Sequence, residues 1–517
     1  MSPLPRALTN FINVMYRIHA YLILSYFIKA TSMTSTSTYG ITGFGGYIPR
    51  LRMERAAIAA AHNWMAPSLR SLGKGQRAFC SWDEDSVTMA VEAARDVLAG
   101  RPPQKLSALY LSSSTMPFAD LQNSAIVAGA LNLAPDLRTL DAGSSQRSGT
   151  SALLSALRAA DGDALLIASE RPKGKPASTQ EINYGAGAAA FTLGSEDVIA
   201  TLLGSATRTT LFVDHFRANG AEYDYVWEER WIRDEGYMKL VPETARAALA
   251  QAKVTPGDVR HLVMPSPYKG IAGAVAKKLG IPAEAEATGL DESCGFTGAA
   301  HGLLMLAHVL EKAAPGDIVL LIGFGQGCDA IVLRVDDAIR AFRPRRGVGG
   351  ALADAQHHDA YLRMLSYEGG IAPEWGMRAE KNVKTALTEQ YRSSDQLSHF
   401  VAGKCRSCNT VQFPQLPYCV TPGCNAPQRN LDPVSLVDEP ARVLTHTADW
   451  LSYHPAPPLY VGFVQFENGA RLLMEVVDVG KQGLDVGTPL RMVFRVKEMD
   501  KTRGYPRYFW KATPVQA

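Results

Sequence analysis

The sequence has no excess of charge of either sign. Its 517 residues include 53 basic and 50 acidic side chains, which leaves a formal net charge of +3. A strong positive balance is what draws a protein to nucleic acid or to an anionic membrane surface, and none is present in this composition. We therefore expect neither nucleic acid nor a membrane among its partners.

Cysteine is also scarce. The chain has seven cysteines, of which four lie within residues 405–424 and three, Cys80, Cys294 and Cys328, are scattered. In a chain of this length such a set is not a disulfide framework. This usage indicates a reducing, cytoplasmic compartment.

A clean hydrophobic run that could cross a membrane is missing as well. Residues 11–30, FINVMYRIHAYLILSYFIKA, are apolar but contain Arg17 and His19, whereas a spanning helix needs about 20 apolar residues with few or no charges. No small-residue cleavage site marks a signal peptide. We interpret residues 1–38 as an N-terminal extension, either disordered or an artefact of an upstream start codon. A helix lying on a membrane surface is the alternative.

What the sequence does contain is an α/β pattern with an internal repeat, from Tyr39 to about Val335. A helix rich in small residues begins at Gly149 and again at Gly298, and each is followed by a Gly-Asp turn, a buried strand, a Gly-rich turn and a second strand. A helix that is apolar nearly all round is a central, buried one. The repeat predicts a duplicated α/β fold whose two helix N-termini meet near a pseudo-twofold axis, where their N–H groups suit an oxyanion or thioester carbonyl.

The last third of the chain has a different pattern. Cys405, Cys408, Cys419 and Cys424 follow the spacing C-x2-C-x10-C-x4-C, and two such pairs are typical of a structural tetrahedral zinc site. Iron in a rubredoxin-like site is an alternative, and four unrelated buried cysteines are another. From Ala441 onward about five short strands predict a small barrel of OB type.

Changes in composition predict where the parts of the chain begin and end. The linker starts near a Pro/Gly/Arg-rich segment at 343–350, and the polar stretch after it is helix-prone. The predicted parts are the extension 1–38, a first domain 39–335, a linker and helical segment 336–398, a zinc ribbon 399–432 and an OB domain 433–517.

The first domain resembles the hydroxymethylglutaryl-CoA synthase and ketoacyl synthase III branch of the thiolase superfamily. The segments that carry the resemblance, in the family's order, are GYIPR, DEDSVTMAVEAARDVL, LDAGSSQRSGTSALL, GAGAAAFTLG, MPSPYKG and APGDIVLLIGFGQGCDA. A zinc ribbon followed by an OB barrel is similar to the acyl-CoA-associated domains that accompany thiolase-like enzymes. The resemblance implies a five-layer αβαβα domain, a homodimer, and a tunnel that brings a CoA or acyl-carrier thioester to the site.

The family's catalytic positions are only partly kept. Glu84 matches a general acid/base glutamate, although a carboxylate at this place also complements a helix dipole. Gln146 stands where the family has its nucleophilic cysteine, Pro265 where it has a histidine, and Cys294 where it has an asparagine. Glutamine cannot form a thioester, and the sequence shows no base paired with the neighbouring Ser145.

Cys294 is open to two interpretations. Near a helix N-terminus, which lowers the pKa of a thiol, it would act as a displaced nucleophile or as an acid/base; otherwise it is a small buried hydrophobe. We expect Ser145, Phe296 and Lys269 to contact the substrate. Lys269 and the basic loop 171–175 would bind CoA phosphates, unless they are only solvated.

Two functions of different classes fit these observations. The first is an acyl-CoA carbon–carbon bond-forming or bond-cleaving enzyme of aldol, retro-aldol or decarboxylative type, with Glu84, Gln146 and Cys294 as its catalytic residues. Glutamine at the nucleophile position resembles decarboxylating ketosynthase-like domains, and a thiolase-fold steroid side-chain aldolase with a zinc-ribbon/OB partner offers a similar case. The second is a non-catalytic acyl-CoA-binding scaffold for another thiolase-like subunit. The expected metal is one structural Zn²⁺, and the expected substrate is a CoA thioester.

Overall fold

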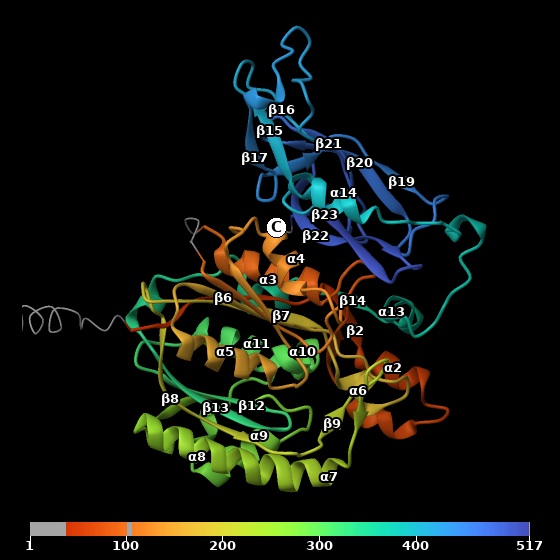
Figure 1. Ribbon diagram of the computed structural model, residues 1–517. Coiled ribbons are helices and arrows are strands. Elements are labelled where there is room, and N and C mark those ends of the chain that lie inside the picture. The colour runs from red at the N-terminus through yellow and green to blue at the C-terminus, as the bar shows by residue number, and fades with distance from the viewer. Residues whose placement is uncertain (1–37, 101–105, 516–517) are drawn as a thin grey trace, which may run out of the picture.

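The larger body of the protein is built on one nine-stranded sheet. The computed structural model describes residues 38–100 and 106–515 (Figure 1), so the predicted extension lies almost wholly outside the described residues. The strand order is β11-β12-β13-β8-β1-β7-β6-β4-β5. The strands are β1 (Gly40–Tyr47), β4 (Ala108–Ser112), β5 (Arg138–Ala142), β6 (Ala164–Glu170), β7 (Gly187–Gly194), β8 (Ala200–Thr209), β11 (Val259–Val263), β12 (Ile318–Phe324) and β13 (Gly327–Val335).

Two half-sheets and three helix layers alternate through this body (Figure 1). The two halves of the sheet meet where β1 and β8 pair through two residues each. The outer helices of the first half are α3 (Ser86–Leu98) and α4 (Asn123–Ala130), the central pair is α5 (Ser148–Ala159) and α11 (Gly298–Leu310), and the outer helices of the second half are α8 (Val241–Ala252) and α9 (Ile271–Leu279). This is the αβαβα order that the resemblance implied.

The central helices start within one residue of the positions that the internal repeat predicted. A Cβ on Gly149 would lie 2.4 Å from the backbone oxygen of Ala299, so a glycine is what lets α5 approach α11 so closely. The outer helix α3 begins at a capping box, in which the Asp85 carboxylate accepts a 2.8 Å hydrogen bond from the Thr88 N–H. Within the described ranges, no helix has both the length and the hydrophobicity needed to span a bilayer.

Shorter elements surround the central layers. A three-stranded sheet joins β2 (Leu51–Glu54), β3 (Gln76–Ala78) and β14 (Gln356–His358), and a hairpin joins β9 (His215–Phe216) to β10 (Tyr225–Val226). The α-helices outside the layers are α2 (Arg55–Ala61), α6 (Thr179–Asn183), α7 (Glu229–Trp231), α10 (Asp291–Cys294), α12 (Gly347–Ala353), α13 (Tyr361–Glu368), α14 (Leu387–Arg392) and α15 (Ser394–Leu397). Because β14 pairs with β2, part of the predicted linker 336–398 is built into the first body.

The C-terminal part contains two antiparallel sheets. The first has three strands, β15 (Val401–Cys405), β16 (Val411–Gln412) and β17 (Leu431–Ser435), and the second has six, β18 (Ala441–Val443), β19 (Thr447–Asp449), β20 (Leu459–Phe466), β21 (Arg471–Glu475), β22 (Pro489–Asp500) and β23 (Tyr505–Pro514). A bridge between Val476 and Ala512 brings the end of β21 to β23. The assignment of this sheet to the OB type stays a prediction.

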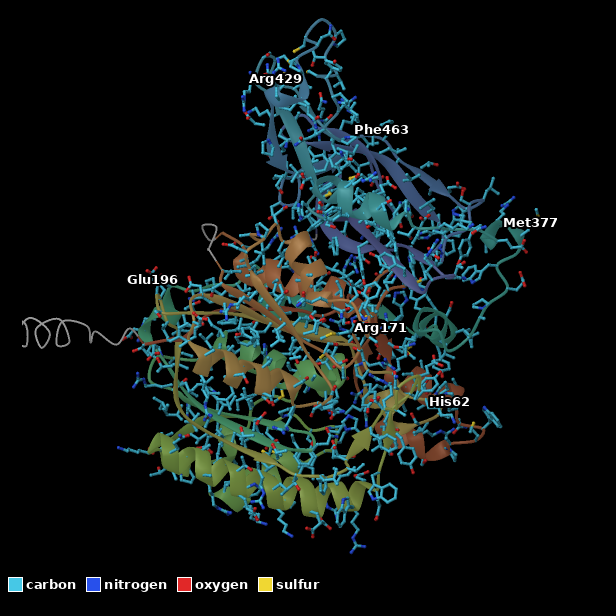
Figure 2. The ribbon with its side chains drawn as sticks, in the orientation of Figure 1. His62, Arg171, Glu196, Met377, Arg429 and Phe463 are labelled. Carbon is cyan, nitrogen blue, oxygen red and sulfur yellow. The ribbon has the colours of Figure 1, made fainter. Side chains whose placement is uncertain are left out.

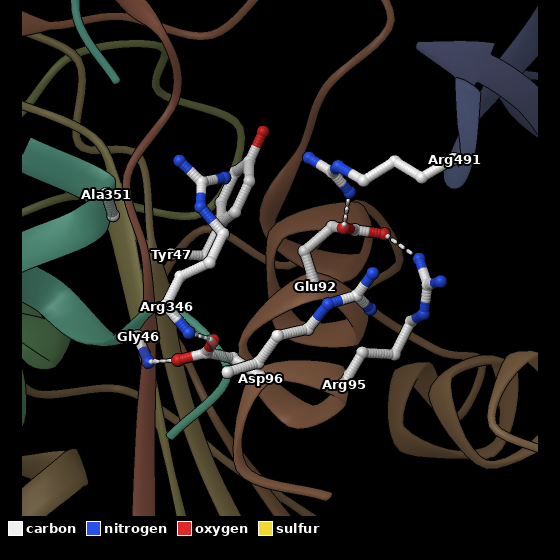
Figure 3. A pocket seen from close by; sticks show the side chains of 9 residues that line it. Gly46, Tyr47, Glu92, Arg95, Asp96, Arg346, Ala351 and Arg491 are labelled. Carbon is white, nitrogen blue, oxygen red and sulfur yellow. Dashed lines mark hydrogen bonds and ion pairs between the residues drawn. The ribbon is translucent and has the colours of Figure 1, made fainter. Parts of the chain in front are cut away.

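Strand β22 packs against helix α3 of the first body (Figure 1). The Glu92 carboxylate accepts from Arg95 at 2.9 Å and from Arg491 of β22 at 3.0 Å, as Figure 3 shows. Arg95 also donates to the backbone oxygen of Met492 at 2.7 Å. Burial alone would raise the pKa of Glu92, but the two guanidinium groups outweigh it and hold the pKa at about 2. The two parts are therefore joined by buried ion pairs.

Candidate active site

Three parallel strands end at one edge of the first half-sheet. Strand β4 pairs in parallel with both β5 and β6, so the loops that follow these strands meet at the same place. The Ser113 N–H donates to the Ala142 oxygen at 3.0 Å, which joins the loop after β4 to the end of β5. Gln146 and the start of α5 follow β5, and the basic loop that starts at Arg171 (Figure 2) follows β6.

The loop that carries Gln146 lies against the Gly-rich loop between β12 and β13. The Ser145 hydroxyl donates to the Gly325 oxygen at 3.1 Å, and Arg147 Nε donates to the same oxygen at 2.9 Å. Arg147 also forms a 2.9 Å ion pair with the buried Asp329. No acid/base side chain is hydrogen-bonded to Ser145 in the described part of the chain, so this geometry gives Ser145 no activating base. The loop is therefore held in place by both halves of the fold.

Cys294, the third predicted catalytic residue, is completely buried. It ends α10, and its thiol points at the backbone oxygens of Leu290 and Gly295 at 3.4 and 3.5 Å. Burial raises the pKa of Cys294 to about 12, against the opposing charges of Arg52 and Arg55. This environment therefore raises the pKa of the Cys294 thiol, whereas a helix N-terminus was expected to lower it. The thiol is protonated near neutral pH.

Phe296 and Lys269, the two other residues predicted to contact the substrate, have different surroundings. Phe296 is buried and bridges to Tyr184, and its oxygen accepts from the Gly185 N–H at 3.0 Å. Lys269 is exposed and lies 3.4 Å from the carboxylate of Glu292. Neither lines the cavity described below, so their contact with a substrate stays a prediction.

Glu84 is buried beneath the C-terminal part, in the turn before α3. Its Oε1 contacts both the Tyr47 hydroxyl and Arg495 of β22, and its Oε2 accepts from the Ser81 N–H at 2.8 Å. Arg495 also pairs with Asp478 at 2.7 Å. Burial raises the pKa of Glu84 above its ordinary value, and the charge of Arg495 opposes that rise. The carboxylate therefore belongs to a buried network made by both parts of the chain.

A cavity of about 470 Å³ opens between the two parts beside Glu84. Its first wall carries carboxylates and cations. Its second wall is mostly apolar and comes from β22, the turn after it and the start of β23. The charged residues of the first wall are Glu84, Asp85, Arg171, Lys173, Arg217 and Glu222, and the residues of the second are Val496, Met499, Gly504 and Pro506. Three cations balance three carboxylates on the first wall, and the N–H donors of these cations together with the apolar wall suit a ligand with an anionic end and an apolar end.

The predicted catalytic residues differ in their relation to this cavity. Glu84 and the basic loop at Arg171 line the cavity, whereas Gln146 and Cys294 do not. Sequence reasoning missed Tyr47 and Arg495, because nothing in the sequence links positions so far apart. It also missed Glu170, a buried carboxylate at the end of β6 that accepts from the Ser114 N–H at 2.7 Å. The position of Glu170 directly after a predicted buried strand was the one available signal.

The four clustered cysteines form a candidate metal site apart from the cavity. Their Sγ atoms all lie within 4.8 Å of one another, with separations of 3.5 Å for Cys408–Cys419 and 3.8 Å for Cys405–Cys424. A tetrahedral zinc with sulfur ligands at about 2.3 Å requires sulfur separations of about 3.8 Å. Four thiolates at these distances fit a closed, structural site, while the identity of the metal stays a prediction.

Similarity to known proteins agrees with this architecture. A family model for the C-terminal part of 3-oxoacyl-[acyl-carrier-protein] synthase III matches residues 249–335. Among solved structures, HMG-CoA synthase complexed with CoA has a TM-score of 0.56 at 16% identity, covering 67% of this chain and 94% of that chain. The 3-oxoacyl-(acyl carrier protein) synthase III of Pseudomonas aeruginosa has a TM-score of 0.52 at 24% identity, covering 58% and 99%. These two structures share the fold.

Sequence similarity is higher to one group of enzymes. The hydroxymethylglutaryl-CoA synthase of Methanopyrus kandleri is 30% identical over 323 residues, which make up 60% of this chain and 92% of that protein. Nearly the whole length of that relative is therefore matched, while a large part of this chain lies outside the match. The chain belongs to the hydroxymethylglutaryl-CoA synthase family of thiolase-like proteins.

Proposed function

We propose that the protein is an enzyme that makes or breaks a carbon–carbon bond next to the thioester of an acyl-CoA. The observation that carries the proposal is the cavity beside Glu84, which joins a buried carboxylate to three cations at the loop edge of the sheet. Its relatives are named hydroxymethylglutaryl-CoA synthases, a condensing activity on CoA thioesters. Arg171, Lys173 and Arg217 would hold the phosphates of the CoA.

The altered residues decide which type of reaction we propose. Gln146 cannot form the acyl-enzyme of the family, and Cys294 is buried as a neutral thiol. Aldol, retro-aldol and decarboxylative reactions pass through a thioester enolate and need no covalent link to the enzyme. Such a reaction requires a proton-transfer group and donors for the enolate oxygen. Glu84 with the Tyr47 hydroxyl would be the proton-transfer group, and the Gln146 amide would be one donor to the enolate oxygen.

Substitution of Glu84 tests this proposal directly. The purified protein would be incubated with a β-hydroxyacyl-CoA, with malonyl-CoA, and with acetyl-CoA plus acetoacetyl-CoA, and the products measured by mass spectrometry. We expect turnover of at least one of these, and a loss of about a hundredfold or more in Glu84→Gln. Full activity in Glu84→Gln would remove Glu84 from the mechanism.

The matched control is Glu181→Gln. Glu181 is also a buried glutamate with a tyrosine and a charged partner, since it accepts from Tyr361 at 2.5 Å and pairs with His62 at 3.0 Å. It does not line the cavity, so we expect its loss to affect stability without abolishing turnover. Melting temperatures of both variants would separate the two effects.

A second candidate function is supported by one observation, the burial of Cys294 together with glutamine at position 146. A non-catalytic acyl-CoA-binding scaffold needs the cavity and no nucleophile. Tight binding of acetyl-CoA, measured by calorimetry, without turnover of any of the thioesters would favour this function.

A further inference from the structure

His215 lies in the β9–β10 hairpin, next to the loops that carry the family's catalytic positions. Its Nδ1 is 2.8 Å from Oδ2 of Asp214, and Oδ1 of Asp214 accepts from Gln326 Nε2 at 2.9 Å. Gln326 also donates to the backbone oxygen of His215 at 3.1 Å. The carboxylate thus fixes the ring with Nδ1 as the donor, which leaves Nε2 to exchange protons.

The loop that anchors this pair also touches the Gln146 loop. Gln326 follows Gly325, whose oxygen accepts from Ser145 and Arg147, and a Cβ built on Gly325 would lie 3.3 Å from the Cβ of Gln146. One short segment therefore contacts the hairpin on one side and the nucleophile position on the other.

The far end of the hairpin reaches the cavity and the Cys294 region. Arg217 lines the cavity, donates to the Ser114 oxygen and pairs with Asp224 at 2.9 Å. Arg217 follows His215 by two residues, just beyond β9, so the chain leads directly from the histidine to the cavity. Burial, and then the charge of Asp224, raise the pKa of Tyr184. Tyr184 directly precedes Gly185, which packs against Cys294.

The ring of His215 is partly exposed, and its pKa lies above the ordinary value. Its side chain is 15% exposed, and across the described residues no protein atom is hydrogen-bonded to Nε2. Burial lowers the pKa of His215, and the charge of Arg217 lowers it further. The hydrogen bond and the charge of Asp214, together with the charge of Asp224, outweigh both and leave the pKa above its ordinary value.

We infer that His215, oriented by Asp214, is a second proton-transfer residue of this site and takes over the work of the histidine that Pro265 replaces. This inference rests on the proposed function. In the cleaving direction, Nε2 takes the proton of the β-hydroxyl, the Cα–Cβ bond breaks, and its electron pair forms the thioester enolate as the carbonyl product leaves. The enolate carbon takes a proton from the Glu84–Tyr47 pair, and solvent carries the proton of His215 back to that pair.

The test compares His215→Gln with His261→Gln. His261 forms a similar pair with Asp317 at 2.9 Å, but it lies on β11, and Asp317 precedes β12 at the end of that strand opposite to Gly325. With a thioester that the wild type turns over, we expect kcat to fall about a hundredfold or more in His215→Gln, with KM and acetyl-CoA binding unchanged. His261→Gln should keep the wild-type kcat. Equal kcat values in the two variants would overturn the inference.

The pH profile separates a proton-transfer role from a structural one. A base that must be neutral makes kcat rise with pH through the pKa of His215. This rise on the acidic side of the wild-type pH profile, the acid limb, should therefore disappear in His215→Gln. Asp214→Asn removes the charge that keeps this pKa high, so its acid limb should move to lower pH. An unchanged acid limb in both variants would contradict the inference.

A third measurement does not depend on turnover. Diethylpyrocarbonate modifies accessible histidines, and saturating acetyl-CoA should protect His215 but not His261 when peptides are analysed by mass spectrometry. Lack of protection would overturn the location of His215 at the thioester site. Protection in a protein that turns over no thioester would support that location while refuting the proposed function, so the two failures are distinguishable.

Discussion

Among single residues, Glu84 depends on a side chain from the far end of the chain. Arg495 is the cation in contact with its buried carboxylate, and both side chains are nearly inaccessible to solvent. Removing one partner of a buried ion pair leaves an uncompensated charge and costs about 3–5 kcal/mol. We therefore expect Arg495→Met to lower the free energy of unfolding by about this amount at pH 7, as measured by urea denaturation.

The pH dependence of that loss has a definite sign. Arg495 lowers the pKa of Glu84 in the folded protein, so its removal raises this pKa further above the unfolded value of about 4.3. A carboxyl whose pKa rises on folding destabilises the folded state above the unfolded pKa. The difference from wild type should thus grow as the pH rises from about 4 to about 7. Arg491→Met is the control, because Glu92 keeps Arg95 as a second partner, and it should show a smaller loss.

Cys294 gives a second test at this scale. A buried thiol with a pKa of about 12 is neutral at pH 8 and reacts slowly, because the thiolate is the reactive form. We expect iodoacetamide at pH 8 to leave Cys294 unmodified in the folded protein and to modify it in urea. Intact-mass analysis after incubation with acetyl-CoA should likewise show no acyl group on it. Rapid labelling of Cys294 in the folded state, or an acyl adduct lost in Cys294→Ala, would restore it as a nucleophile.

Among the elements, the three-stranded sheet β15–β17 is the one that we expect to depend on a bound metal ion. Its four cysteines converge, and the apolar cluster beside them is small, so metal binding should supply much of its folding free energy. We expect one zinc per chain by elemental analysis, and less than one in Cys419→Ser. Chelation should expose amides in residues 400–430 to hydrogen exchange while the α/β body stays protected.

Cys328→Ser provides the control for the ribbon. Cys328 is a buried cysteine of β13, far in sequence from the ribbon, so this variant should keep one zinc per chain. Iron in place of zinc would favour the rubredoxin-like alternative. A protein without any metal that keeps residues 400–430 protected would contradict a structural metal site.

For the whole molecule, the resemblance implies a homodimer. Strand β5 is the last strand in the order of the nine-stranded sheet, and Leu140 on it is 53% exposed. A free edge with an apolar side chain is a place where another strand can pair. We expect light scattering to give twice the mass of the chain, and Leu140→Lys to shift the mass toward the monomer. A wild-type monomer at micromolar concentration would contradict this expectation.

The sequence by itself determined the local and repeated features of this protein. The starts of α5 and α11 followed from Gly149 and Gly298, because a small-residue pattern with a helical period is a local signal. The same is true of the cysteine spacing. These features depend on neighbours in the chain, so an inspection of neighbouring residues is enough to find them.

The tertiary structure decided which of those residues work together. Arg495 reaches Glu84 across more than four hundred residues, and the cavity beside them has one wall from each part of the chain. The burial of Cys294, which reversed the expected direction of its pKa, depends on how α10 packs against Gly185. Ion pairing and desolvation depend on distance in space, and a sequence pattern carries no information about side chains that meet only after the chain has folded.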